Sequence, residues 1–166
     1  MSSLVGTLLV ARPTLRDGFF SRTVILLLQH GSEGAFGLVL NRPAKAEGLS
    51  FPVFVGGPCE MQGLLMLHGH ADWMDKGEES PGEVCPGVFM GDEATFERVS
   101  GMTEDAEAKF RVVTGYSGWG PDQLETEMAD GAWIVLPGSA EHLFETPAAE
   151  LWEKLAPPTL PEPSLN

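Results

Sequence analysis

The amino-acid sequence predicts a single α+β domain organised around a mostly antiparallel sheet. Two short apolar runs, residues 24–28 and 36–40, flank a polar, glycine-bearing segment at residues 30–35, which is the pattern of a hairpin. Each run is almost continuously apolar, so we expect both faces of its strand to be covered. Strands and helices are mixed without the regular alternation of a doubly wound sheet, which favours the α+β class.

The remaining strands are predicted from short apolar runs bounded by glycine, proline, asparagine or aspartate. In chain order the predicted strands cover residues 6–11, 22–28, 36–40, 51–55, 64–68, 86–90, 110–115 and 132–136. Between two of them, residues 72–83 carry five acids and one lysine. We expect this segment to be an exposed loop.

Three helices are predicted from their capping residues, at residues 93–100, at residues 121–130 and from residue 147 onwards. Asp92 is a favourable N-cap for the first helix, and Thr146 is one for the third. The second helix starts with a proline and is followed by a glycine, the usual punctuation of a helix.

Length and composition set the domain organisation. The chain has 166 residues, of which 43% are hydrophobic and 20% charged, which fits one domain that buries about 70% of its unfolded surface. We place this domain at residues 1–156 and a Pro-rich flexible tail at residues 157–166. No apolar run approaches the ~18 residues of a membrane span, and the first ten residues lack the features of a secretory signal. We therefore expect a soluble, cytoplasmic protein.

Charge is unevenly distributed along the chain. The net charge is −14, yet residues 1–58 hold five bases and three acids, whereas the remainder holds five bases and 21 acids. Non-specific DNA affinity comes mostly from lysine and arginine contacts to phosphates. The sequence therefore predicts no direct nucleic-acid binding. The acidity fits either a well-solvated surface or an acidic face for a basic partner.

Polar residues at the ends of the hairpin are the first candidates for a binding site. Arg22 precedes its first strand, His30 follows that strand, and Asn41 and Arg42 follow the second. If the hairpin pairs in simple register, Arg22 and Asn41–Arg42 lie at the same end and could bind a carboxylate or phosphate. They could equally satisfy strand-end carbonyl groups and pair with acids of the acidic half.

Other binding candidates lie further along the chain. Gly56 and Gly57 could offer backbone N–H groups to an anion, or they could form a tight turn or a close strand contact. Tyr116 and Trp119, beside Gln123, supply aromatic surface of the kind found at interfaces, although large aromatic side chains also build cores.

The signals for catalysis and metal binding are weak. His68, His70 and Asp72 have the i, i+2, i+4 spacing that would place three ligands on one face of a strand, but they also fit a strand end followed by a loop. The segment around Ser117 does not match a nucleophile elbow. The two cysteines, Cys59 and Cys85, are expected to be free thiols. We therefore predict no cofactor, and no catalytic residue is assigned.

Several segments together resemble one bacterial family. They occur in the same order as in that family and span about residues 6–155. They are GTLLVARPTLRDGFFSRTVILLLQH, GAFGLVLNRP, VFVGGP, a strand ending at His68, GYSGWGPDQLETEM, AWIVLP and LFETPAAELWEKL. The chain is identified by them as a member of the AlgH/YqgE family of small bacterial proteins, which carry the label transcriptional regulator. The resemblance implies a bifurcated sheet curled into a pseudo-barrel with a few flanking helices. It implies no established reaction.

Three functional hypotheses follow. The favoured one is a non-enzymatic cytoplasmic protein that acts through contacts with a protein partner rather than through direct DNA binding. The second is a small-molecule or metabolite-binding domain whose Arg22, Asn41 and Arg42 form an anion site. The third is an undetected hydrolase, or a redox enzyme that uses Cys59 or Cys85.

Overall fold

The hairpin predicted from the two apolar runs is the centre of the fold. In the computed structural model, β2 (Val24–Gly31) pairs antiparallel with β3 (Gly34–Val39). The turn between them is only Ser32–Glu33, so the strands run further into the polar segment than the sequence predicted. The structure describes residues 4–12, 20–44, 53–60, 64–69, 83–91, 110–146 and 148–156. The predictions for residues 72–82, 93–100 and 157–166 lie outside these ranges.

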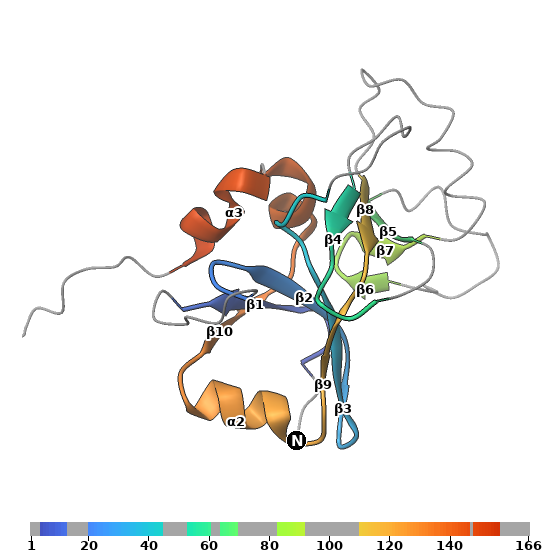
Figure 1. The fold of residues 1–166 in the computed structure, drawn as a ribbon. Helices are drawn as coiled ribbons and strands as arrows, with labels where there is room; N and C mark the ends of the chain where they lie inside the picture. The colour runs from blue at the N-terminus through green and yellow to red at the C-terminus, as the bar shows by residue number, and fades with distance from the viewer. Residues whose placement is uncertain are drawn as a thin grey trace, which may run out of the picture.

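Two five-stranded sheets make up the domain (Figure 1). The first has the order β10-β1-β2-β3-β9, and the second has the order β4-β8-β5-β7-β6. Every neighbouring pair is antiparallel except β4 with β8. The strands besides the hairpin are β1 (Thr7–Ala11), β4 (Val53–Val55), β5 (Leu65–His68), β6 (Glu83–Cys85), β7 (Val88–Met90), β8 (Phe110–Thr114), β9 (Ser117–Trp119) and β10 (Trp133–Pro137). The predicted α+β class is confirmed.

The two sheets diverge at the end of β3. Residues 35–37 of β3 pair with β9, but the Val39 N–H donates to the Gly56 carbonyl at 2.8 Å, and the Val55 N–H donates to the Arg42 carbonyl at 2.7 Å. Residues 35–37 therefore pair with β9 in the first sheet, and residues 39–42 of the same stretch bond to β4 and to Gly56 in the second. Figure 1 shows β8 continuing directly into β9 across the same junction. This is the predicted bifurcated sheet, and it is not closed into a barrel.

Both faces of the hairpin are buried, as the continuous apolar runs predicted. Leu26 and Leu38 belong to one core cluster, together with residues of β5 and β8. Ile25 and Val39, which alternate with them, belong to a second cluster beside Trp119 and Trp133. Because side chains alternate along a strand, each strand contributes to both cores.

A β-bulge at Leu28 changes the direction of the side chains that follow. Leu27 pairs with Gly37 and Gln29 pairs with Phe36, so Leu28 is the extra residue. Leu27 and Gln29 therefore face opposite sides of the sheet, although residues two apart normally share a face. Leu28 and Gln29 both face the space between the sheets, and His30 faces helix α2 (Gln123–Ala129).

Helices α2 and α3 (Ala148–Leu155) pack against strands of the first sheet, whereas the short π-helix η2 (Glu141–Glu145) packs against β8 of the second. Helix α2 falls inside the predicted range 121–130. Helix α3 buries Leu151 as predicted, and η2 comes before it. The predicted Thr146 cap is not formed among the described residues, because the Thr146 hydroxyl has no hydrogen-bond partner there. No helix in the described ranges is long and apolar enough to cross a bilayer.

Strand β6 and the turn after it correct the sequence prediction. Glu83 begins β6 rather than ending the acidic loop, and Pro86 lies in the turn between β6 and β7 rather than in a strand. The acidic composition of the preceding residues hid a three-residue strand of which only Cys85 is buried.

Candidate functional site

An apolar groove lies where the two sheets separate, and we call it the fork groove. Its volume is about 380 Å³. The apolar side chains that line it come from the chain before β1 and from β2, β3, β5, β6 and β7: Val5, Leu28, Phe36, Leu65, Val84 and Met90. Gln29 and Glu83 are its polar lining residues. Val5 is 41% exposed, the only large apolar side chain so exposed in the described part of the chain.

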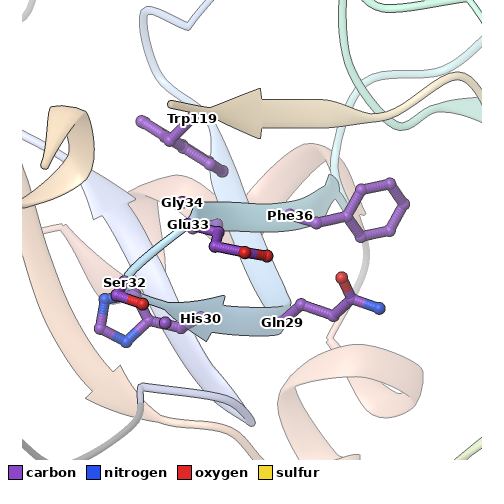
Figure 2. A pocket seen from close by; sticks show the side chains of 9 residues that line it. Gln29, His30, Ser32, Glu33, Gly34, Phe36 and Trp119 are labelled. Carbon is purple, nitrogen blue, oxygen red and sulfur yellow. The ribbon is translucent and has the colours of Figure 1, made fainter. Parts of the chain in front are cut away.

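A second pocket, which we call the tip pocket, surrounds the turn of the hairpin and has a volume of about 490 Å³ (Figure 2). Its side chains include Gln29, His30, Ser32, Glu33, Phe36 and Trp119. Gln29 and Phe36 line both hollows, so the fork groove and the tip pocket are neighbours. Gly34 has a φ of +128°, and a Cβ there would lie 2.1 Å from the Trp119 carbonyl oxygen. The turn therefore requires glycine at this position.

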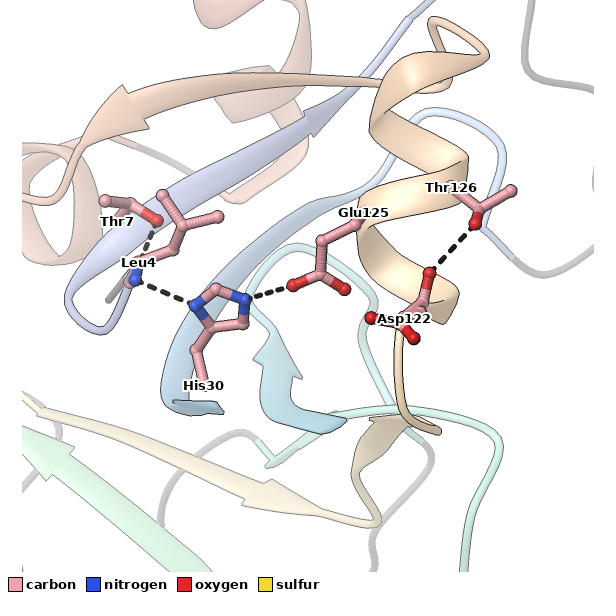
Figure 3. A network of polar contacts seen from close by, with 6 residues as sticks. All are labelled: Leu4, Thr7, His30, Asp122, Glu125 and Thr126. Atoms are coloured by element: carbon pink, nitrogen blue, oxygen red, sulfur yellow. Dashed lines mark hydrogen bonds and ion pairs between the residues drawn. The ribbon is translucent and has the colours of Figure 1, made fainter. Parts of the chain in front are cut away.

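His30 is held from two sides rather than presented to a substrate (Figure 3). Its Nδ1 accepts a hydrogen bond from the Leu4 N–H at 3.1 Å, and its Nε2 lies 2.6 Å from Glu125 Oε2 on α2. Because Nδ1 accepts, the ring proton is on Nε2 and points to the carboxylate. This hydrogen bond is the main cause of the lowered pKa of Glu125. His30 therefore joins β2 to α2 and to the start of the chain.

Glu127, which the sequence did not single out, organises the aromatic residues behind the tip pocket. Its Oε1 accepts indole N–H bonds from Trp119 at 3.1 Å and from Trp133 at 2.9 Å. Its Oε2 accepts a bond from the Gln123 amide at 3.2 Å, and the Gln123 Oε1 accepts from the Gly120 N–H at 2.9 Å. Gln123 thus fixes the turn into α2, and Trp119 is almost fully buried.

The residues at the other end of the hairpin come together as predicted. The Asn41 side chain accepts a bond from the Val24 N–H and donates one to the Arg22 carbonyl, both at 3.0 Å. The Arg22 guanidinium pairs with Glu153 at 3.1 Å and lies 4.9 Å from the centre of the Trp152 ring. Asn41 and Arg22 are thus engaged by the chain itself, in line with the second interpretation offered for them.

Arg111 binds backbone carbonyl groups, which is the role that the sequence suggests for Arg22 and Arg42. It is buried on β8 and donates to the carbonyl groups of Leu40 and Leu143, while its guanidinium lies 4.6 Å from the Phe54 ring centre. Burial lowers its pKa to about 10, so it stays charged at neutral pH. Arg42, two residues after Leu40, is half-buried at the same junction.

Gly56 and Gly57 lie against the backbone that links β8 to β9. A Cβ on Gly56 would lie 2.4 Å from the Gly115 carbonyl oxygen, and one on Gly57 would lie 2.1 Å from the Tyr116 carbonyl carbon. Tyr116 exchanges two backbone hydrogen bonds with Cys59 at 3.0 Å, and its ring stacks on Phe36 at 4.9 Å. These glycines permit the close approach of chains at the junction.

The candidates for metal and thiol chemistry are only partly within the described residues. His68 is buried and stacks on Phe89 at 5.6 Å, whereas His70 and Asp72 lie outside the described ranges. Within those ranges, no three His, Cys, Asp or Glu side chains are grouped to hold a metal ion. Both cysteines are free, and burial, with the nearby Glu83, raises the pKa of the Cys85 thiol to about 11. Such a thiol is a poor nucleophile at neutral pH.

Comparison with known proteins identifies the family. A family model described as AlgH-like matches residues 8–159. The chain belongs to the AlgH-like family. A UPF0301 protein of Chlamydia trachomatis is 35% identical to this AlgH-like chain over 160 residues, covering 89% of it and 82% of the relative. A UPF0301 protein of Myxococcus xanthus is 32% identical over 168 residues, with 92% and 89% covered.

Solved structures share the fold of this AlgH-like protein. The AlgH protein of Pseudomonas aeruginosa superposes with a TM-score of 0.68 at 25% identity, covering 92% of this chain and 87% of that one. Protein DIP2367 of Corynebacterium diphtheriae gives a TM-score of 0.73 at 21% identity, covering 93% and 85%. None of these names describes a ligand or a reaction.

Proposed function

We propose that this AlgH-like protein is a protein-interaction module whose fork groove binds an extended apolar segment of a partner protein. The observation that carries the proposal is the fork groove itself, where six apolar side chains from five strands and the chain before β1 line one hollow. Burying a leucine-sized side chain contributes about 1.5–3 kcal/mol. One or two such contacts supply about 1.5–6 kcal/mol, so hydrogen bonds and charges along the rest of the segment add to the affinity.

The size of the groove favours side chains of a peptide over a larger metabolite. Its volume of about 380 Å³ is near the lower end of the roughly 300–1,000 Å³ typical of small-molecule sites. Gln29 and Glu83 are its polar lining residues, and the Glu83 carboxylate makes the margin of the groove acidic. No basic residue is among the described residues that line it. An apolar segment with basic flanks therefore complements it best.

The chemistry of the chain supports the cytoplasm as the place of this contact. Cys59 and Cys85 are both free, which suits a reducing compartment. The family label of transcriptional regulator is compatible with the proposal if regulation acts through a bound protein. The net charge of −14 makes such an indirect route more favourable than contact with DNA.

Selection of random peptides displayed on phage tests the proposal. We expect the enriched peptides to share an apolar residue and to bind the Val5→Asp variant about tenfold more weakly, a loss of about 1.4 kcal/mol. Ala149→Asp is the matched control, because it adds the same charge on an exposed position of α3. Peptides that bind both variants and the original protein equally would place the contact elsewhere, and a selection without enrichment would refute the proposal.

A further inference from the structure

We propose that the tip pocket takes a cationic side chain, lysine or arginine, from the same partner segment whose apolar residue occupies the fork groove. This inference rests on the proposed function and names the chemistry of its partner. It is carried by the charges that line the tip pocket, by the contacts of His30, and by the position of the pocket beside the groove.

Glu33 is the charged group of the tip pocket. It lies at the exposed turn of the hairpin, next to Ser32, and Figure 2 shows both side chains with Gln29 around the hollow. Within the described residues, Glu33 makes no ion pair or hydrogen bond, and no lysine or arginine lines the pocket. A carboxylate, a hydroxyl and an amide oxygen together offer three acceptors to an ammonium or guanidinium group.

His30 does not neutralise Glu33. Both of its ring nitrogens are already engaged, Nδ1 by the Leu4 N–H and Nε2 by Glu125, and its side chain is only 5% exposed. These two contacts hold the ring between β2, the chain before β1 and α2. Glu125 adds a second carboxylate behind the histidine, so the tip of the hairpin keeps an excess of negative charge.

The described bases nearest in sequence are too far along the hairpin to compensate this charge. Arg22 and Arg42 lie at the opposite end, and the eight residues of β2 separate Arg22 from the turn. At about 3.3 Å per residue this is roughly 26 Å. The Debye length at physiological salt is about 8 Å, so their field is screened at the tip pocket.

The tip pocket and the fork groove meet at the cross-strand pair of Gln29 and Phe36, which lines both. The bulge at Leu28 places this pair on the groove side of the sheet. Because an extended segment advances about 3.3 Å per residue, one segment can fill both hollows with residues close in sequence. The partner motif is therefore an apolar residue with a lysine or arginine a few positions away.

A pair of matched probes tests the inference. Nα-acetyl-lysine methylamide and its uncharged counterpart, Nα-acetyl-norleucine methylamide, are titrated into ¹⁵N-labelled protein. We expect the lysine probe to shift the Ser32 and Gly34 amide signals and the Trp119 indole signal saturably, while the norleucine probe shifts fork-groove signals only. Glu33→Gln should weaken lysine-probe binding about two- to fivefold, the range of an exposed ion pair, whereas Glu150→Gln, with the same change in charge on α3, should not.

The outcomes separate this inference from the proposed function. Tip-pocket signals that stay unmoved at several tens of millimolar lysine probe, or equal binding by Glu33→Gln, overturn the cation pocket. If the norleucine probe still shifts the groove signals, the proposed function stands without it. A lysine response in the tip pocket without any norleucine response in the groove would count against the proposed function and leave an isolated cation site.

Discussion

Glu127 shows how one half-buried carboxylate can organise a whole aromatic cluster. Its Oε1 is the acceptor for two indole N–H groups, and both tryptophans are largely buried, with 6% of Trp119 and 4% of Trp133 exposed. Phe20 packs on both rings: its ring centroid lies 6.4 Å from that of Trp119 and 5.9 Å from that of Trp133. The position of β9 against β10 and α2 therefore depends on this residue.

Replacing the half-buried Glu127 should destabilise the protein more than replacing an exposed glutamate does. Glu127→Ala leaves two buried N–H donors without an acceptor, at about 1–3 kcal/mol each, so we expect a loss of about 2–6 kcal/mol in the free energy of unfolding. Urea denaturation followed by tryptophan fluorescence measures it. Glu150→Ala, an exposed control on α3, should change stability by less than about 0.5 kcal/mol. Equal stability of the two variants would show that the indole contacts are not needed.

At the scale of elements, hydrophobic runs and turn residues predicted the strands of the hairpin, β1, β8 and β10. The helix at Gln123–Ala129 was predictable because a proline and a glycine bracket it. The bulge at Leu28 was not, because three successive leucines carry no information about which of them is the extra residue. Strand β6 was missed because a short edge strand needs few apolar residues.

The contact between β2 and α2 gives the stability a pH dependence. The hydrogen bond from His30 lowers the pKa of Glu125 below its ordinary value of 4.5. A lowered folded pKa stabilises the protein above that ordinary value, and this contribution is lost as the pH falls through the folded pKa. The original protein should therefore exceed Glu125→Gln in stability near neutral pH, and the gap should close in the acid range.

Urea denaturation of both proteins from about pH 7 to about pH 3 measures this gap. Glu150→Gln serves as the control for the loss of an exposed carboxylate on α3, which has no such histidine contact. A gap that stays constant down to the lowest pH would contradict the role assigned to the His30 contact, and so would a gap that widens as the pH falls.

The whole chain is strongly acidic in composition, and this charge opposes binding to other polyanions. With a net charge of −14, it should form no submicromolar complex with duplex DNA at about 0.15 M salt, where surface charges act over about 8 Å. Fluorescence anisotropy of a labelled duplex measures this. A saturable submicromolar complex would contradict the argument from charge.

The candidate site was predictable only in part. Arg22 and Asn41 were expected together because the two strands of a hairpin end side by side, and they are joined. His30 and Trp119 were both named as candidates, but their meeting at one pocket depends on the pairing of β3 with β9. The fork groove draws residues from positions 5 to 90, and no local pattern reveals where two sheets separate.

The most direct measurement of the central claim is a methyl-NMR map of an enriched peptide bound to the intact protein. The proposed function predicts that the largest shifts fall on the methyl groups of the fork groove: Val5, Leu28, Leu65, Val84 and Met90. Methyl groups on the far side of the core, such as those of Leu124 on the buried face of α2, should stay unchanged. Largest shifts outside the fork groove, for example around Arg22 and Trp152, would contradict the claim.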